Sequence, residues 1–288
     1  MDVELPLSRL IRVICLALAG VSAVARAQDF DYESILKAEP RSTGVYFTVG
    51  TGVGVFQDIQ VPMNPRTGVR ANGSTDKAEH LTHIGIPIAF SLGQERNVGT
   101  VWYLRPWEIM ASKMGASNGA SGTNNATYSR LGLRSALRRS WYLGAWQLDT
   151  GGNVELRRSA FGNAAEAHYI NAALVGSQLR LGRGGYSLEI GGEIAPTASF
   201  GYSPVGFFGG SQFPGSIAKL MGYSATSSLM VDRNVWIDLG LATEIATVTI
   251  PDVSYYQGYG LSARNLDSSS RSYKLTTQTV RLGLRRLF

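Results

Sequence analysis

The sequence has one cysteine, few charges for its length and, after its N-terminal region, no long apolar run. The single cysteine, Cys15, excludes a disulfide within the chain as a source of stability. No later stretch has the ~20 apolar residues that a transmembrane helix needs. The net charge of +6 is spread along the chain, with no Lys/Arg run longer than two, which argues against nucleic-acid binding. No Pro- or Ser-rich linker divides the chain, so a single main domain is expected.

The N-terminus has the pattern of a secretory signal. Arg9 and Arg12 precede the apolar run Val13–Val24, and Ala25–Ala27 fits the small-x-small cleavage rule. Cleavage before Gln28 would also remove the only cysteine. We therefore predict a signal peptide at residues 1–27, with a short uncleaved anchor as the alternative. The acidic segment 28–42 is predicted to be a short N-terminal periplasmic segment. A disordered leader is favoured, and the alternative is a segment with a weak helical face that lies at the periplasmic mouth against the basic turns.

The rest of the chain, residues 43–288, is dominated by strands whose apolar residues recur at every second position. In the first of them Val45, Phe47 and Val49 share one face, while Gly44, Tyr46 and Thr48 share the other. Several of the segments are about twice the usual strand length of ~5–6 residues. The ten predicted strands are Gly44–Val55, Leu81–Leu92, Val101–Met110, Tyr128–Leu137, Trp141–Leu156, Tyr169–Leu181, Tyr186–Pro196, Met221–Val231, Val235–Thr249 and Tyr273–Phe288.

The predicted connections alternate between long and short. Tight turns are expected, for example, at Arg138–Ser140, Gly182–Gly185 and Asp232–Asn234. Long loops are expected at residues 56–80, 112–126, 157–168, 197–217 and 250–272. In an antiparallel barrel this pattern places five long loops on one rim and the tight turns on the other.

Aromatic residues are predicted to gather beside both rims. Such rings favour the boundary between apolar and aqueous phases, so two girdles indicate two interfaces. The short-turn rim would hold Trp141, Tyr142, Tyr186, Trp236 and Phe288, and the long-loop rim Trp107, Tyr128, Tyr169, Tyr223 and Tyr273.

Together these features resemble the Gram-negative outer-membrane β-barrel proteins. The last residues resemble the C-terminal signal of that class, with Arg281 at its polar place, Gly283 at its glycine place and Phe288 at its end. Arg286 departs from it, because an apolar residue is usual there. The resemblance implies an all-β, up-and-down antiparallel barrel of about ten strands in the outer membrane. It also implies outer-membrane lipid, the barrel-assembly machinery and periplasmic chaperones as partners. The last strand is predicted to close the barrel against Gly44–Val55.

The alternation places a set of charged residues of both signs inside the predicted barrel. A ten-stranded barrel is narrow, so a structural ion-pair network is the favoured interpretation, and a functional cluster with perturbed carboxylates is the alternative. The predicted lumen charges are Arg130, Arg134, Asp149, Glu155, Arg157, Arg180, Glu189, Glu193, Asp238 and Glu244.

The sequence offers little support for catalysis, a metal or a cofactor. His80 and His83 lie three residues apart, which on a strand places them on opposite faces, and His80 beside Glu79 is only a weak candidate base. The Asp-His and Asp-Asp pairs of the omptin proteases, which resemble this chain in length, do not occur. His168, Asn171 and Ser177 have the residue types of the outer-membrane phospholipases without their motif.

Three functional hypotheses therefore stand. The favoured one is a non-enzymatic outer-membrane barrel, porin-like or membrane-structural, with a polar and largely filled lumen. The second is a surface adhesin or ligand-binding barrel that acts through its long loops, among them the Phe-rich segment 204–214. The third is a protease or lipid hydrolase at the rim.

Overall fold

The computed structural model describes residues 43–58, 81–99, 101–117, 125–143, 145–162, 167–203, 211–212, 217–249 and 272–288. The predicted signal peptide, the N-terminal segment 28–42 and His80 lie outside the described residues, as does nearly all of the Phe-rich segment. No described residue forms a helix long and apolar enough to cross a membrane.

The described chain consists of long strands joined in an antiparallel meander. Most are longer than the sequence pattern predicted, because the alternation continues into segments assigned to loops. The strands are β1 (Gly44–Asp58), β2 (Leu81–Val98), β3 (Trp102–Ser117), β4 (Asn125–Leu143), β5 (Trp146–Gly162), β6 (Ala167–Arg183), β7 (Tyr186–Ser203), the two-residue β8 (Ser211–Gln212), β9 (Ile217–Asp232), β10 (Val235–Thr249) and β11 (Ser272–Leu287).

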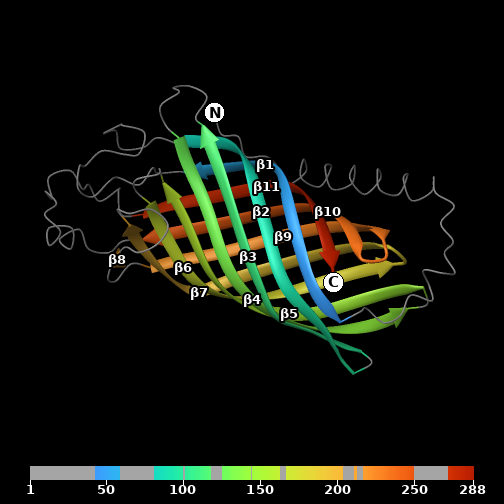
Figure 1. Cartoon of the computed structure of the whole chain (residues 1–288). Helices are drawn as coiled ribbons and strands as arrows, with labels where there is room; N and C mark the ends of the chain where they lie inside the picture. Colours follow the sequence, from blue (N-terminus) through green and yellow to red (C-terminus); the bar gives the residue numbers. More distant parts are fainter. Residues whose placement is uncertain are drawn as a thin grey trace, which may run out of the picture. The chain divides into compact units, whose positions relative to one another are not determined.

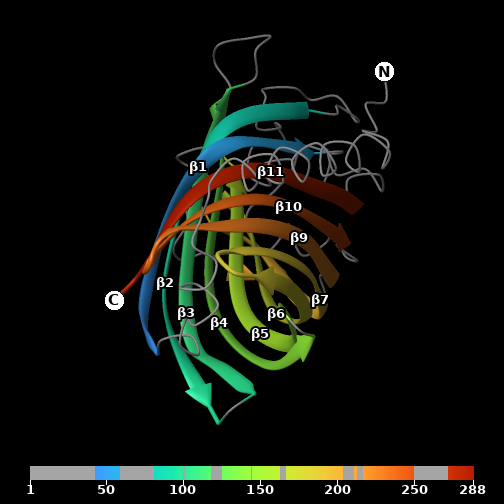
Figure 2. The ribbon, with the colours of Figure 1, turned by 90° about the vertical axis from the view of Figure 1, so that its right-hand side faces the viewer.

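The ten long strands close into a barrel. The order in the sheet is β6-β5-β4-β3-β2-β1-β11-β10-β9-β7-β8, and an additional β6–β7 pairing completes the circle. Figure 1 shows β1 to β5 crossing in front of the strands of the opposite wall, and Figure 2 shows the curvature of the sheet from the side. Each long strand therefore has a partner on both sides, which leaves no long open edge. The predicted fold class, a closed antiparallel barrel of about ten strands, is confirmed.

The closing seam joins β1 to β11, as predicted. The register runs without interruption from Tyr46 opposite Leu287 to Asp58 opposite Leu275, and places Gly50 opposite Gly283. The two backbones come very close at Gly52, where an added Cβ would lie 1.9 Å from the carbonyl oxygen of Val280. Glycine at this position lets the seam close without a steric clash.

The faces of the barrel reverse the pattern of a water-soluble protein. Along β2 the predicted apolar face is exposed, from Ile84 at 61% and Ile86 at 67% to Leu92 at 42%. The same outward face carries Val49 on β1 and Leu156 on β5, both exposed. Many charged side chains lie on the inner face, several of them buried. An apolar exterior with charged side chains on the inner face is the arrangement that a surrounding membrane stabilises.

One predicted turn is wrong. Arg138–Ser140 lies within β4, which continues to Leu143, and the chain reverses between Leu143 and Trp146. The alternation continues through these residues, with Arg138 on the inner face and Arg139 on the outer face. The turns at Gly184–Gly185 and Arg233–Asn234 lie within the predicted segments. Gly184 has a φ of 56°, a conformation that glycine adopts readily.

The five predicted long loops are all shorter than expected, two of them markedly. β3 extends to Ser117, and β5 extends to Gly162, so residues 163–166 alone connect β5 to β6. The longer strands also change the aromatic assignment. Trp107 lies well inside β3 rather than at the long-loop rim, and Tyr128 points into the lumen. The predicted girdle is therefore wrong for these two residues.

Candidate functional site

Six of the ten charged residues predicted for the lumen converge at mid-height in the barrel. Glu155 on β5 is completely buried and binds three arginines from β4 and β5. Its Oε1 accepts hydrogen bonds from Arg130 Nη2 at 3.0 Å and Arg157 Nε at 2.6 Å. Its Oε2 accepts from Arg134 Nη2 at 2.7 Å and Nε at 3.0 Å. This carboxylate is thus saturated by charge-assisted hydrogen bonds.

Arg157 carries the network to other strands of the barrel. Its Nη1 donates to Glu244 Oε2 on β10 at 2.9 Å, and its Nη2 donates to Glu193 on β7. Tyr128 on β4 donates its hydroxyl to Glu244 Oε1 at 2.7 Å. Side chains from β4, β5, β7 and β10 therefore meet inside the barrel. We call Arg130, Arg134, Glu155, Arg157, Glu193 and Glu244 the central network.

The remaining predicted lumen charges lie nearer the short-turn rim, in separate pairs. Arg285 Nε lies 3.2 Å from Asp238 Oδ2, and Arg180 Nη1 lies 3.7 Å from Asp149 Oδ2. Glu189 binds Arg138, whose two terminal nitrogens donate at 2.9 and 3.0 Å. The residues predicted for the lumen thus form one central network and several smaller pairs.

The sequence-based reasoning missed a second group of lumen charges. Arg105 donates to Glu95 at 2.6 Å and to Glu108 at 3.0 Å. The sequence pattern did not reveal this group for two reasons. The second strand was predicted to end at Leu92, before Glu95, and a register shift between Arg105 and Glu108 interrupts the two-residue period of β3. Arg138 was missed because it was assigned to a turn.

The half of the lumen toward the long-loop rim is apolar, which the sequence analysis did not predict. Inward side chains from β3 to β7 and from β9 to β11 form a buried cluster, with Met114 and Phe200 each 1% exposed. The polar lumen expected from the sequence is therefore confined to the middle and the short-turn half. We call this cluster the apolar plug: Met114, Tyr128, Phe161, Ile170, Ala172, Leu174, Ala195, Phe200, Ala218, Leu220, Ala246, Val248 and Leu275.

The residues of the predicted C-terminal signal separate onto the two faces of β11. Arg281 and Gly283 lie on the inner face, opposite Gly52 and Gly50 of β1. Phe288 is 68% exposed, and the guanidinium of Arg286 lies 5.1 Å from the centre of its ring. Arg286, the residue that departs from the pattern, thus faces outward next to an aromatic ring, where a long cationic side chain can reach the interface.

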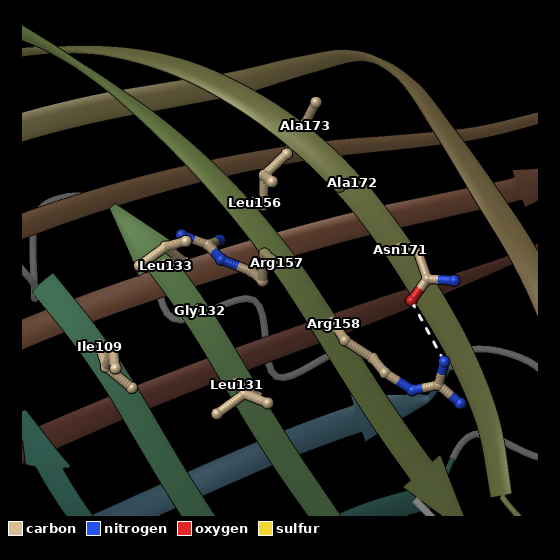
Figure 3. Close-up of a pocket in the computed structure, with 10 residues that line it drawn as sticks. All are labelled: Ile109, Leu131, Gly132, Leu133, Leu156, Arg157, Arg158, Asn171, Ala172 and Ala173. Carbon is tan, nitrogen blue, oxygen red and sulfur yellow. Dashed lines mark hydrogen bonds between the residues drawn. The ribbon is translucent and has the colours of Figure 1, made fainter. Parts of the chain in front are cut away.

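A shallow hollow lies on the outer surface across β3 to β6 (Figure 3). Its lining is mostly apolar and includes Ile109, Leu131 and Leu156. At one end Arg158 donates to Asn171 at 3.5 Å and lies 3.9 Å from the ring centre of Tyr169. Because these side chains are on the outer face, the hollow belongs to the surface that contacts lipid and not to the lumen.

The structure tests few of the weaker catalytic candidates. His80 and the side chains of His83 and His168 lie outside the described residues. Asn171 and Ser177 are on the outer face of β6. Within the described part of the chain, no group of three or more His, Cys, Asp or Glu residues is placed to hold a metal ion.

The fold and the distribution of side chains define the class of the protein as a transmembrane β-barrel of the outer-membrane type. No protein-family profile matches the sequence, and no curated protein matches it. Among solved structures, the chain is similar to the outer membrane protease OmpT from Escherichia coli, with 8% identity and a TM-score of 0.46, covering 87% of this chain and 99% of that one.

Two further solved structures are similar at comparable levels. The translocator domain of the autotransporter NalP from Neisseria meningitidis has 11% identity and a TM-score of 0.36, with 94% and 98% of the two chains covered. An outer membrane channel from Pseudomonas putida F1 has 15% identity and a TM-score of 0.36, with 91% and 99% covered. These proteins have different activities, and likeness at this level does not distinguish among them.

Proposed function

We propose that this chain is an integral outer-membrane β-barrel protein without enzymatic activity, and that its barrel is closed to solutes. Its role is then membrane-structural, and the porin-like role is the alternative. The observation that carries the proposal is the apolar plug, whose buried side chains come from eight of the ten long strands, β3 to β7 and β9 to β11. A water-filled pore needs a polar, hydrated path through the barrel, and side chains fill barrels of about this size.

The exposed apolar surface supports a place in a membrane. Large apolar side chains remain exposed on the outer faces of β2, β5 and β11, among them Ile86, Leu156 and Leu282. Burying them in water-free hydrocarbon stabilises the barrel, and the closed sheet satisfies its backbone hydrogen bonds internally. The predicted secretory signal agrees with this location. In such barrels the short turns face the periplasm, which places the central network and its smaller pairs on the periplasmic side of the apolar plug.

Membrane integration is tested by fractionation and by heat modifiability. We expect the protein in the outer-membrane fraction and, in detergent, a folded form that migrates differently on gels from heated protein. Recovery in the soluble fraction, or identical migration before and after heating, would contradict the proposal.

Closure is tested in planar lipid bilayers. We expect no discrete conductance steps from the folded wild-type protein, because the apolar plug excludes water. The double variant Met114→Ala, Phe200→Ala removes two of the largest buried side chains of the plug, and we expect it to conduct. The matched control, Leu131→Ala with Leu156→Ala, truncates two outward side chains and should stay closed. Regular conductance from the wild-type protein would establish the porin-like alternative instead.

A further inference from the structure

Charged side chains differ in sign between the two faces of the barrel. In the described part of the chain, eight arginines and eight carboxylates face the lumen, and every one of these carboxylates forms an ion pair with a lumen arginine. The outward side chains of the described strands include eight cations, namely Arg96, Lys113, Arg139, Arg158, Arg183, Lys219, Lys274 and Arg286. The lumen is therefore balanced in charge, whereas the outer face is basic.

The acidic groups on the described outer face lie far from β4. They are Asp232, at the end of β9, and the terminal carboxylate of Phe288, after β11. Asp232 accepts a hydrogen bond from the backbone N–H of Arg233 at 2.7 Å. In the closed sheet β9 and β11 are each four places from β4. The outward cations of β4 and its neighbours therefore have no described carboxylate beside them.

One of these cations, Arg139 on β4, lies against two indole rings. Its guanidinium carbon lies 4.1 Å from the ring centre of Trp141, the next outward residue on β4, and 5.7 Å from that of Trp102 on β3. Trp102 is directly opposite Arg139 in the strand register. Trp141 donates its Nε1–H to Thr150 Oγ1 on β5 at 3.2 Å, which holds its ring in place. We call Trp102, Arg139 and Trp141 the indole–arginine site.

The guanidinium of Arg139 keeps its N–H donors unpaired. Among the described residues, its charged group interacts with the two indole rings and with no carboxylate or other hydrogen-bond acceptor. A guanidinium over an aromatic face can still direct its N–H groups away from the ring. Trp102 is 42% and Trp141 43% exposed, and Arg139 is exposed as well, so a ligand at the outer surface can reach all three side chains.

The indole–arginine site lies near the short-turn rim. Arg139 is close to the end of β4 at Leu143, and indole rings favour the level of the lipid headgroups. A second contact of the same kind lies on the next strands, where the guanidinium carbon of Arg183, at the end of β6, is 5.5 Å from the ring centre of Trp146, at the start of β5. Basic side chains at this level attract anionic lipid headgroups.

We infer that the indole–arginine site binds the headgroup of an anionic glycerophospholipid in the membrane leaflet at the short-turn rim. The phosphate accepts hydrogen bonds from Arg139, because the planar N–H donors of a guanidinium match phosphate oxygens, and the indole rings cover the glycerol region. Charge complementarity favours this lipid over a zwitterionic one, whose cationic headgroup is repelled by Arg139 and Arg183. The inference rests on the proposed function, since only a membrane supplies this ligand.

The test measures how brominated lipids quench tryptophan fluorescence, which they do only on contact with an indole. The folded protein is placed in phosphatidylcholine vesicles that contain a fixed fraction of either brominated phosphatidylglycerol or brominated phosphatidylcholine. The ratio of the two quenching constants is compared, so a change in the fluorescence of a variant itself cancels. We expect the wild-type protein to prefer phosphatidylglycerol by about fivefold, and Arg139→Gln to lose most of this preference.

The matched control is Arg96→Gln. Arg96 is also an outward arginine at the short-turn rim, but its Nη2 donates to Gln94 at 3.1 Å. This variant should keep most of the preference for phosphatidylglycerol. An equal loss in the two variants would show only diffuse attraction by the outer cations and would overturn the site. Equal quenching of the wild-type protein by the two lipids would overturn it too.

Two further measurements keep the outcome unambiguous. Heat-modifiable migration shows whether a variant has folded, and should Arg139→Gln not fold, Arg139→Lys keeps the charge but loses the planar donors. We expect a severalfold lower preference in Arg139→Lys, and an unchanged preference would count against the site. Sodium phosphate at constant ionic strength should not compete, whereas competition would mean that the site takes free phosphate. A protein that does not enter vesicles contradicts the proposed function, whereas an inserted protein without lipid preference contradicts this site alone.

Discussion

The two halves of the lumen are built from opposite chemistry on the same strands. On β5, Phe161 belongs to the apolar plug, while Glu155 and Arg157 belong to the central network a few residues away. On β6, Leu174 lies in the plug directly beside Glu155 in the register. The plug is held by dispersion and exclusion of water, and the network by charge-assisted hydrogen bonds in a region of low dielectric. The comparison shows how one narrow barrel can be filled in two ways.

The apolar plug and the central network differ in how they tolerate substitution. An apolar cluster needs no particular partner, so one side chain can often replace another of similar volume. A buried network fails when a single member is removed, because the remaining charges lose their compensation. The network half therefore depends on particular charged partners, whereas the plug half depends on the volume and packing of its side chains.

The largest effect is expected from the centre of the network. Glu155→Ala leaves Arg130, Arg134 and Arg157 without their shared carboxylate, and should lower the free energy of unfolding by about 3–5 kcal/mol. Urea unfolding of the protein in lipid vesicles measures this. The matched variant Glu189→Ala removes one member of a partly exposed pair with Arg138, and it should lower the free energy of unfolding by clearly less. Equal losses of unfolding free energy in the two variants would show that the central network stabilises the barrel no more than the partly exposed pair does.

The next effect concerns the apolar plug. Phe200→Ala removes a side chain that is 1% exposed, and a loss of about 3–4 kcal/mol is expected from the transfer and cavity costs. Leu156→Ala on the outer face serves as the control, because its side chain is 62% exposed to the surrounding lipid. Should the two changes cost the same in urea unfolding, the plug would not be a packed core.

A smaller effect is expected at the seam that both halves share. A Cβ on Gly52 would meet the carbonyl oxygen of Val280 at 1.9 Å, so Gly52→Ala must push β1 away from β11 at a cost of about 1–3 kcal/mol. At Gly240 the nearest atoms would lie at 3.7 Å or more, and Gly240→Ala should be nearly neutral. The fraction of heat-modifiable protein after refolding compares the two variants, and a neutral Gly52→Ala would argue against the tight seam.

The smallest loss of unfolding free energy is expected at Tyr128, which contacts both halves of the lumen. Tyr128 packs in the plug and donates its hydroxyl to Glu244. Tyr128→Phe removes that hydrogen bond and keeps the ring, so a loss of about 1 kcal/mol is expected. Tyr142→Phe, on an exposed ring, should leave the unfolding midpoint unchanged. A loss above that of Phe200→Ala would mean that the network, rather than the plug, determines how this ring is held.

Much of the fold was predictable because strand periodicity is local. Alternation along Leu81–Leu92 identified the lipid-facing residues correctly, and the pattern at Val280–Phe288 predicted its pairing with β1. The ends of strands were less predictable. Arg138–Ser140 looks like a polar turn but continues β4, because pairing with β3 and β5 outweighs the local preference of these residues.

The candidate site was only partly predictable. Alternation placed Arg134, Glu155 and Glu193 on the inner face, since side-chain direction depends only on position along a strand. It did not predict which arginine meets which carboxylate, because that depends on the stagger between strands and the width of the barrel. The group formed by Arg105, Glu95 and Glu108 was also not predicted, because a register shift between Arg105 and Glu108 interrupts the alternation along β3.

The sequence by itself determined that this chain forms a barrel with an apolar outer face and charges inside, because a period of two along a strand needs no knowledge of distant contacts. The tertiary structure decided how the interior is divided. It brought Arg157 to Glu193 and Glu244, and it gathered scattered residues such as Met114 and Phe200 into a plug. These contacts form between residues of different strands that lie at the same level along the barrel axis. The stagger between the strands of the closed barrel determines which residues those are.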